Sequence, residues 1–346
     1  MKNINSHKIL LVVKNNPSLS SKQIHSNLDF DISYATVKRH LGKLVSENLI
    51  LPIGEGRGRK YLISPEFDLL YSINMDEYFE KEIDEREIKS TFNLSLISDI
   101  LGKEKLFTEE ELQKLNSLQQ IYKKNISQLN MTQYNKELER LAIDLSWKSS
   151  QIEGNTYSLL ETERLLKEQE TAEGKLKDDA VMLLNHKEAI DFVVSNPDYV
   201  IPLTISKIED IHSILIKDLG VERNIRKRRV GILGTNYTPL DNEFQIKEAL
   251  YDMCNLVNKR EIIFEKALLL LVLLSYIQAF DDGNKRTARI ISNAALINYG
   301  YCPLSFRTVG SIEYKKAMLL FYEQNNISAF KNIFIKQFEF AVKTYF

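Results

Sequence analysis

The sequence predicts a mainly α-helical protein, with a helical body that contains one small β-hairpin and is preceded by a winged helix-turn-helix. Only 13 glycines and 7 prolines occur in 346 residues, which is typical of long regular elements joined by short loops. Apolar residues recur at helical spacing along most of the chain. The chain is 44% hydrophobic and 27% charged, the balance of an ordered globular protein, and its length suits two or three domains.

Several classes of protein are excluded by simple patterns. The N-terminal residues lack the basic, apolar and small-residue order of a signal peptide. The longest apolar run, residues 267–274, is much shorter than the ~20 residues that span a bilayer. Cys254 and Cys302 have neither disulfide-framework nor zinc-site spacing. We therefore expect a cytoplasmic protein without membrane contact.

Charge is distributed unevenly along the chain. Residues 1–65 contain 10 Lys and Arg against 4 Asp and Glu, a net charge of +6, so that the remainder carries −7 of the total of −1. A basic N-terminal module on an acidic body suggests that nucleic acid contacts the first segment only.

Three helices are predicted in this first segment. Residues 9–13 carry the apolar stripe of the first helix, and Ser20 with Gln23 forms a capping-box pattern that begins the second. Ser33 can cap a third helix that continues to about Leu49. The buried face of this third helix is predicted at Val37, Leu41, Leu44 and Val45, and its other face carries Lys38, Arg39, His40 and Lys43.

A hairpin follows the three helices. Residues 50–53 and 61–63 are short β-like runs joined by a basic, glycine-rich loop. Three helices and a hairpin are the order of a winged helix-turn-helix, here residues 1–65, whose third helix would enter the major groove of DNA while the wing holds phosphates. The candidate DNA-binding residues are Lys38, Arg39, Lys43, Arg57, Arg59 and Lys60. Two alternatives are a merely solvated basic face and a fold that serves protein contacts. Since such modules often act on paired half-sites, a homodimer is a further option.

Residues 66–140 predict a helical connector. The stretch is charged and helically spaced, and Thr108 followed by three glutamates is a favourable helix start because carboxylates stabilise the positive end of a helix. We expect it to pack on the C-terminal body, and it carries no identifiable chemistry.

The segment QAFDDGNKRTAR at residues 278–289 concentrates groups that bind phosphate. A tight turn at Gly283 before a new helix leaves backbone N–H groups free to bind an anion. Arg286 and Arg289 are three residues apart, so they share a helix face and can grip a polyphosphate. Asp282 can hold Mg²⁺, which prefers one or two carboxylates together with phosphate oxygens. The segment therefore predicts a nucleoside triphosphate site, and ordinary surface charges on a helix are the alternative.

This segment resembles the signature of the Fic family, H-[PA]-F-x-[DE]-G-N-[GK]-R-x-x-R. The matching positions are Ala279, Phe280, Asp282, Gly283, Asn284, Lys285, Arg286 and Arg289. Gln278 stands where the family has histidine. Lys285 is similar to the Doc branch, which transfers phosphate, whereas Arg289 is similar to the branch that transfers AMP.

The resemblance extends over about residues 140–346. It implies a Fic-type helical bundle at 141–346, with an inhibitory helix at about 141–165 and a core at about 166–346. Ser149, Glu153 and Gly154 fit the family's inhibitory motif. In that family the glutamate reaches the second arginine of the signature, so the resemblance implies that Glu153 pairs with Arg289 and prevents productive seating of the γ-phosphate.

Other positions resemble the flap and the scaffold of the family. Residues 226–232 and 237–239 are similar to the flap, a β-hairpin that aligns an unknown target protein by strand addition. Its candidate residues are Val230, Gly231, Ile232 and Tyr237. His186 and His212 lie on predicted helices that resemble the scaffold, and for both a structural role is the favoured interpretation.

The resemblance also implies roles in AMP transfer from ATP to a protein hydroxyl. Asp282 would hold Mg²⁺, Arg286 and Arg289 would neutralise phosphates, and Gln278, Asn284 and Arg286 would be the catalytic positions. Backbone amides of Gly283, Asn284 and Lys285 would face the phosphates.

A glutamine at the histidine position removes the general base. An amide has no useful proton affinity near neutral pH, and loss of a general base typically costs about 10²–10⁴ in rate. Three hypotheses stay open. The protein is a transferase with another base, such as Asp281, Asp282 or a metal-bound hydroxide; or a nucleotide-responsive DNA-binding regulator with an inactive Fic domain; or a DNA-binding or scaffold protein with a decayed one.

Overall fold

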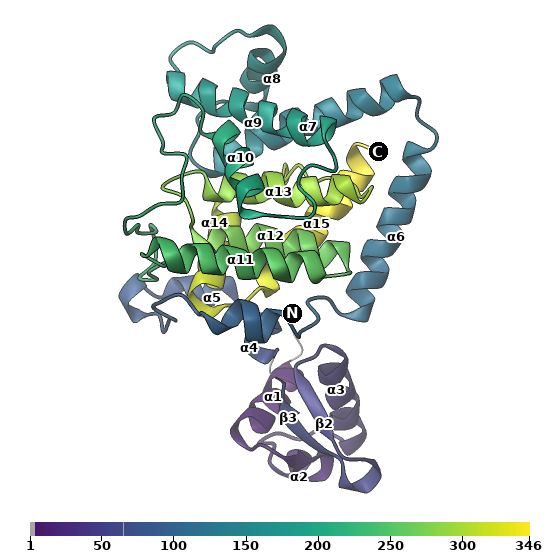
Figure 1. The fold of residues 1–346 in the computed structure, drawn as a ribbon. Helices are drawn as coiled ribbons and strands as arrows, with labels where there is room; N and C mark the ends of the chain where they lie inside the picture. Colours follow the sequence, from purple (N-terminus) through teal and green to yellow (C-terminus); the bar gives the residue numbers. More distant parts are fainter. Residues whose placement is uncertain (1–3, 65) are drawn as a thin grey trace.

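The computed structural model describes residues 4–64 and 66–346 and is mainly helical (Figure 1). Its N-terminal lobe, drawn in purple below the body, combines three helices with a three-stranded antiparallel sheet in the order β1-β3-β2. These elements are α1 (Ile4–Asn15), β1 (Leu19–Ser20), α2 (Ser21–Ser26), α3 (Tyr34–Ser46), β2 (Ile50–Ile53) and β3 (Lys60–Ile63). The element order agrees with the prediction, and β1 adds a third strand against β3.

Local signals explain where these helices begin. The capping box of Ser20 and Gln23 is present, and the Ser33 side chain accepts a hydrogen bond from the N–H of Thr36. On the predicted apolar face of α3, Val37, Leu41 and Leu44 are buried and Val45 is half-buried. One expectation was wrong: His40 lies inside the module, where its Nδ1 is 2.7 Å from Ser6 Oγ on α1.

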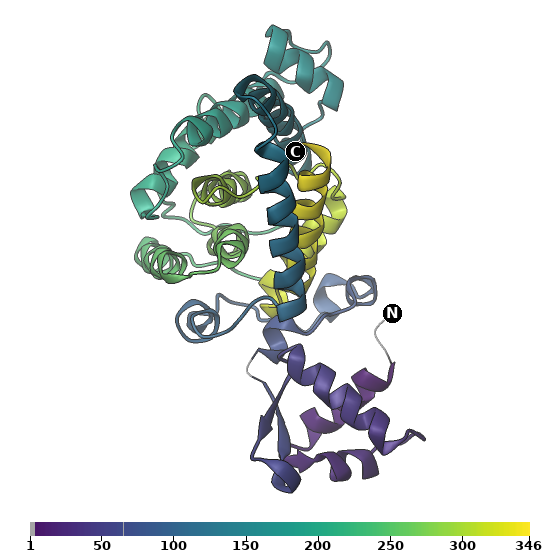
Figure 2. The ribbon, with the colours of Figure 1, turned by 90° about the vertical axis from the view of Figure 1, so that its right-hand side faces the viewer.

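The connector wraps the lower side of the body and then forms a long helix. Its elements are α4 (Phe67–Leu70), α5 (Met75–Glu80), a 3-10 turn (Ile83–Glu85), a π-helical turn (Leu96–Leu101) and α6 (Glu109–Ile126). Thr108 caps α6 as predicted, and α6 packs along α15 (Figures 1 and 2). Asn326 donates to the backbone carbonyls of Asp68 and Tyr71, which fixes the start of the connector against the body.

The body is a bundle built around one apolar helix. Its helices are α7 (Met131–Ile152), α8 (Leu159–Glu168), α9 (Lys177–Ser195), α10 (Ile205–Leu215), α11 (Glu243–Lys259), α12 (Ile263–Ile277), α13 (Asn284–Asn298), α14 (Ser311–Gln324) and α15 (Ser328–Thr344). Residues 264–277 of α12 are all buried, because α12 is surrounded by neighbouring helices. In the described part of the chain, no helix has the length and apolarity needed to cross a membrane.

The helix that precedes Glu153 differs from its predicted bounds. The family resemblance implies a helix at about 141–165, but α7 begins at Met131 and ends at Ile152, and α8 follows as a separate helix. The predicted boundary at residue 140 therefore falls inside a continuous helix. Asn130 and Gln133 form the capping box that begins α7 upstream of that boundary.

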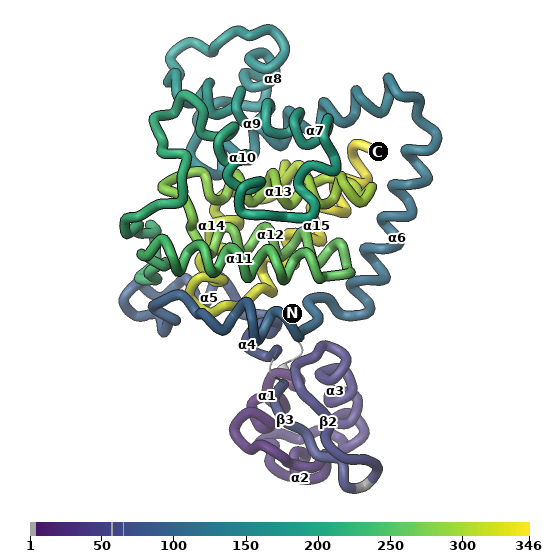
Figure 3. The backbone as a smooth tube through the Cα atoms, viewed as in Figure 1, coloured from purple at the N-terminus to yellow at the C-terminus, as the bar shows by residue number. Residues whose placement is uncertain are grey.

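The predicted β-hairpin of the flap was wrong. Between α10 and α11 the chain forms a loop, traced in Figure 3, whose one bridge joins Thr238 to Thr91 of the connector. Its backbone groups bond to other segments: Thr238 N–H donates to Ser90 O at 2.8 Å, and the Gly234 carbonyl accepts from Arg86 at 2.7 Å. Because distant segments take up these hydrogen-bonding groups, the loop does not pair with itself.

Candidate functional site

The turn between α12 and α13 depends on glycine. The chain leaves α12 through Gln278 and enters α13 through Gly283, both with left-handed backbone angles (φ 52° and 82°). A Cβ atom on Gly283 would lie 3.2 Å from the ring of His212 and 3.3 Å from Ile216 Cγ2. Only glycine combines this backbone angle with so close a neighbour. The predicted tight turn is therefore present. Helix α13 begins directly after it at Asn284, so the backbone N–H groups of its first turn belong to the motif.

Asn284 and Gln278 hold the motif loop together. Asn284 Oδ1 accepts from the N–H of Phe280 at 2.9 Å, and its Nδ2 donates to the Phe280 carbonyl at 2.7 Å and to Gln278 Oε1 at 3.2 Å. Gln278 Nε2 donates to the Ser275 carbonyl at 2.7 Å and to the Tyr322 hydroxyl at 3.2 Å. The side chain of Gln278 is thus engaged by protein groups at both ends of its amide.

His212 supports the loop from α10. Its ring stacks on Phe280 with centroids 3.7 Å apart, and its Nε2 donates to the Asp282 carbonyl at 2.9 Å. Burial lowers the pKa of His212 to about 4, so the imidazole is neutral near pH 7 and carries its proton on Nε2. The structural role expected for His212 agrees with these contacts.

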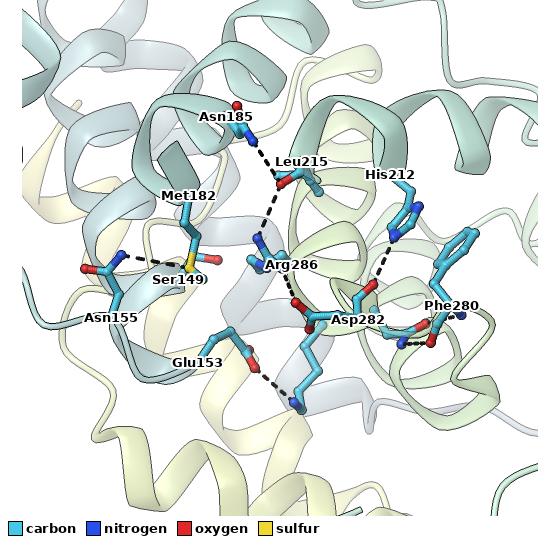
Figure 4. Close-up of polar contacts among 12 residues, drawn as sticks. Ser149, Glu153, Asn155, Met182, Asn185, His212, Leu215, Phe280, Asp282 and Arg286 are labelled. Carbon is cyan, nitrogen blue, oxygen red and sulfur yellow. Dashed lines mark hydrogen bonds and ion pairs between the residues drawn. The ribbon is translucent and has the colours of Figure 1, made fainter. Parts of the chain in front are cut away.

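The two arginines of the motif are buried side by side on α13. Arg286 is 1% exposed and donates to Asp282 Oδ2 at 2.7 Å and to the Leu215 carbonyl at 3.3 Å (Figure 4). Arg289 is fully buried and lies over the ring of Tyr314 at 5.2 Å. Buried guanidinium groups need anionic or carbonyl partners, so this helix end is built to bind an acidic group.

The carboxylate of Glu153, the residue that directly follows α7, occupies that position. Glu153 Oε1 accepts from Arg289 Nη2 at 2.7 Å, as the motif resemblance implied, and its Oε2 accepts from Lys285 Nζ at 2.9 Å. Burial alone would raise the pKa of Glu153, but the charges and hydrogen bonds of Arg289 and Lys285 lower it to about 2. The carboxylate is therefore ionised at neutral pH. The contact with the Lys285 side chain was not predicted, since the resemblance implies a role for the backbone amide of Lys285 only.

Ser149 connects this pair to α9. Its Oγ accepts from Arg289 Nε at 2.8 Å and lies 2.6 Å from His186 Nε2, while its carbonyl accepts from Arg289 Nη2 at 3.1 Å. Burial, followed by the charges of Arg289 and Arg286, lowers the pKa of His186 well below its usual value. Gly154 (φ 107°) provides the turn that ends this segment.

Of the predicted flap residues, one is buried against the end of α12 and three are not. Tyr237 is buried and stacks on Tyr276, whereas Gly231 is exposed and Val230 and Ile232 are half-buried in the loop. The loop instead reaches the motif through Arg228, whose guanidinium makes two hydrogen bonds of 3.0 Å to the Asp281 carboxylate.

Arg226 is the residue that the sequence reasoning missed as part of the site. Its Nε donates to the Gln278 carbonyl at 2.6 Å, its backbone N–H donates to the Ala279 carbonyl at 3.0 Å, and its Nη2 donates to the Leu240 carbonyl. It is 2% exposed although its neighbours Lys227 to Arg229 are exposed. A basic run in a loop is normally solvated, so no sequence signal distinguished the buried member.

The predicted metal ligand, Asp282, does not belong to a cluster of metal-binding side chains among the described residues. The side chain of Asp282 is 62% exposed, and among the described residues no group of three or more His, Cys, Asp or Glu could hold a metal. Such a site fits Mg²⁺ only when phosphate oxygens complete its coordination. Two open cavities of about 740 and 320 Å³ lie elsewhere, and neither is lined by residues 278–289.

The predicted DNA-binding side chains are exposed on the N-terminal lobe where they can be described. Lys38, Arg39 and Lys43 lie on the outer face of α3, and Arg59 and Lys60 lie in the wing. The side chain of Arg57 lies outside the described part of the chain.

Comparison with known proteins agrees with this geometry. Residues 202–296 match the model of the Fic/DOC family. Over 188 residues the chain is 27% identical to the protein adenylyltransferase Fic of Aedes aegypti, covering 52% of this chain but only 37% of that protein. The family-model match at residues 202–296 therefore shows a Fic/DOC family domain within this chain.

Solved structures show the same fold. Fic-1 from C. elegans has a TM-score of 0.60 at 21% identity, covering 68% of this chain and 72% of that chain. A Fic domain containing signaling protein from Bacteroides thetaiotaomicron has a TM-score of 0.54 at 20% identity, covering 68% of this chain and 93% of that chain. The mainly helical fold class is thus confirmed.

Proposed function

We propose that the Fic domain binds ATP with Mg²⁺ and transfers AMP to a hydroxyl group of a protein, restrained by Glu153 and slowed by Gln278. The observation that carries this proposal is the buried pair of Arg289 with Glu153 at the first turns of α13, 2.7 Å apart. A cation held at a helix N-terminus by a displaceable carboxylate is suited to a phosphate. The adenylyltransferase relative supports AMP as the transferred group.

The arginines have capacity for a further anion. Arg289 Nη1 and Arg286 Nε are buried and have no hydrogen-bond partner among the described residues. Phosphate oxygens would satisfy these donors, and the first amides of α13, from Gly283 to Lys285, would complete the site. Asp282 would contribute one carboxylate to Mg²⁺ bound to the phosphates.

Glu153 would act as a competitor of the nucleotide. The carboxylate takes one Arg289 donor and the Lys285 ammonium, both of which a terminal phosphate would use. Ser149 holds the other side of the guanidinium, and Gly154 ends the segment that carries Glu153. The nucleotide must displace the carboxylate before all of its phosphates can bind.

Gln278 would leave the reaction without its usual base. Its amide is engaged with Ser275, Tyr322 and Asn284, and it has no useful proton affinity. Asp281 is a poor substitute because both carboxylate oxygens accept hydrogen bonds from Arg228. We therefore expect slow transfer.

Intact-mass spectrometry tests this proposal. Glu153→Gly protein is incubated with Mg-ATP, with Gln278→His added in a parallel sample. An AMP adduct in both samples, larger with the histidine, is the expected result. The proposal would be overturned if neither sample formed an adduct and if Glu153→Gly protein bound ATP with the same affinity as wild type.

A second candidate function is favoured by the N-terminal lobe. Here the protein is a nucleotide-responsive transcriptional regulator with an inactive Fic domain, binding DNA through a winged helix, as a homodimer on paired half-sites. The exposed cations of α3 and the wing support phosphate contacts, and hydrogen bonds from Asn326 to the connector link the lobe to the body.

Fluorescence anisotropy with duplex DNA tests the second candidate. Binding should weaken with salt, weaken further in Arg39→Glu protein, and change on addition of Mg-ATP. DNA binding that does not change on addition of Mg-ATP would exclude a nucleotide-responsive regulator and would support a DNA-binding role alone. A decayed scaffold, the third hypothesis, is excluded if ATP binds in a Mg²⁺-dependent manner.

A further inference from the structure

His186 is a fully buried histidine beside the motif arginines, and the proposed AMP transfer does not use it. It lies on α9, and its Nε2 is 2.6 Å from Ser149 Oγ of α7. Its Nδ1 is buried and has no hydrogen-bond partner in any other described residue. An apolar side chain would fill the same volume without the cost of an unpaired ring nitrogen, so a histidine at this position needs a physical reason.

The hydrogen bonds around Ser149 fix the direction in which each proton points. Arg289 Nε can only donate, so Ser149 Oγ accepts from it at 2.8 Å. The hydroxyl hydrogen of Ser149 then needs an acceptor. Among the described residues, His186 Nε2 is the one other group that bonds to Ser149 Oγ. Ser149 therefore donates to Nε2, and the proton of the neutral ring is on Nδ1.

The other tautomer of His186 leaves more polar groups unpaired. With its proton on Nε2, both the Ser149 hydroxyl hydrogen and the Nδ1 lone pair would lack a partner, whereas the Nδ1–H tautomer leaves only the Nδ1 N–H unpaired. Burial and the charges of Arg289 and Arg286 lower the pKa of His186 well below its usual value, so the ring is neutral and Nε2 remains an acceptor. His186 and His212 thus carry their protons on opposite ring nitrogens.

Ser149 in turn holds one edge of the Arg289 guanidinium. Its Oγ accepts from Nε and its backbone carbonyl accepts from Nη2 at 3.1 Å, so one residue binds the side edge formed by Nε and Nη2. The end edge, formed by Nη1 and Nη2, is only half used, because Glu153 takes Nη2 at 2.7 Å and Nη1 has no partner among the described residues. A planar fork that is held along one edge presents its other edge in a fixed orientation.

We propose that His186 is a positioning residue: by accepting from Ser149, it holds the side edge of Arg289 and so presents the end edge to the phosphates of the nucleotide. This inference rests on the proposed ATP binding and adds a residue that does not touch the nucleotide. Ser149 lies within α7, whereas Glu153 follows the end of that helix. The hold of Ser149 on Arg289 therefore persists when the carboxylate of Glu153 is displaced, and His186 acts in the restrained and in the open site.

The hold on Arg289 is measured without nucleotide. Hydrogen exchange of the Arg289 Nε–H group is followed by NMR on the full chain, and its resonance is assigned from its loss in Arg289→Lys protein. We expect exchange to be about tenfold faster in His186→Leu protein, the factor for about one hydrogen bond to a charged group. His186→Gln should restore the protection, because a glutamine oxygen can replace Nε2 as acceptor. Ring nitrogen chemical shifts of wild type should show Nε2 unprotonated in His186 and protonated in His212.

Affinity for Mg-ATP measures the consequence for the site. Calorimetric titrations use Glu153→Gly protein, so that the carboxylate does not compete. In this background His186→Leu should weaken ATP binding about tenfold, and His186→Gln should leave it near its starting value. Ser149→Ala should weaken binding at least as much. Adding His186→Leu to Ser149→Ala should cause no further loss, because both changes break the same chain of hydrogen bonds.

Ser146→Ala is the matched control for both measurements. Ser146 is equally buried on α7, and its hydroxyl bonds only to the carbonyl of Ala142 in the same helix, at 2.8 Å. This variant should change neither the protection of Arg289 nor the affinity for ATP. A loss as large as that of Ser149→Ala would assign the effect to general loosening of α7 and would overturn the inference.

Three other results would also overturn it: unchanged protection of Arg289 in His186→Leu protein, a proton on Nε2 of His186, or a further loss of ATP affinity when His186→Leu is added to Ser149→Ala. The tautomer is measured in wild type, so this result does not depend on whether a variant folds. Failure of Glu153→Gly protein to bind Mg-ATP would contradict the proposed function, while the protection of Arg289 still decides whether His186 holds the guanidinium.

Discussion

If the site binds ATP as proposed, replacing Glu153 by glutamine should raise its affinity for ATP. The pKa of Glu153 is lowered from 4.5 to about 2, which corresponds to about 3 kcal/mol of interaction in favour of its charged form. A neutral amide of the same shape loses most of that interaction. Since ATP would no longer displace a carboxylate from Arg289, its affinity should rise by roughly 30- to 100-fold.

The same change should destabilise the protein without nucleotide. Arg289 would remain buried without a charged partner, beside Ser149 and the ring of Tyr314, at a cost of about 2–3 kcal/mol in the free energy of unfolding. The folded-state pKa is depressed, so this stability is present above about pH 4.5 and is lost as the pH falls towards 2. The difference between wild type and variant should therefore shrink over that interval.

Calorimetry and urea unfolding measure the two effects. Isothermal titration with Mg-ATP gives the affinity, and unfolding from pH 7 to pH 3 gives the stability. Glu248→Gln, an exposed carboxylate on α11, is the matched control and should change neither quantity. An ATP affinity within twofold of wild type in Glu153→Gln protein would refute the competition between carboxylate and phosphate.

Three further predictions concern the motif loop. Gly283→Ala should lower the free energy of unfolding by about 2–3 kcal/mol in urea titrations, because a Cβ at φ 82° meets the His212 ring, whereas Gly231→Ala, with nothing within 4 Å, should not. The pKa of His212 is lowered to about 4 in the folded protein, whereas in the unfolded chain the ring binds a proton below about pH 6.5. The free energy of unfolding should therefore fall as the pH is lowered from about 6.5 to about 4, and an unchanged free energy of unfolding over this interval would contradict the burial of the ring. Arg226→Lys keeps the charge but loses the fork of hydrogen bonds to Gln278 and Leu240, so unfolding should become easier by about 2–4 kcal/mol, as thermal denaturation can check.

Local chemistry was well predicted from the sequence. The caps at Ser20, Ser33 and Thr108 each depend on residues within one helical turn, so their pattern contains the information that forms them. The turn at Gly283 is equally local. The contact of Glu153 with Arg289 is not local, and the family resemblance, rather than spacing, implied it.

Features that depend on distant segments were missed. The flap was expected to pair with itself, but Ser90 and Arg86 of the connector take its hydrogen-bonding groups from more than a hundred residues away. His40 lies on a basic face by sequence, yet α1 covers it. Arg226 and its exposed neighbours look alike in sequence. Helical periodicity and charge describe one element at a time, and these positions are decided between elements.

The side chain of Gln278 is not a base, but its amide contributes three hydrogen bonds to the motif loop. Its amide donates two hydrogen bonds and accepts one, linking α12, Tyr322 and Asn284. A neutral imidazole has one donor and one acceptor, so it cannot make all three. A histidine that restores a base at this position must release at least one of these partners, and the loop held by Asn284 is then less firmly fixed. Gain of proton affinity and loss of loop stability are therefore coupled at this residue, and the glutamine favours an ordered motif loop over a basic side chain.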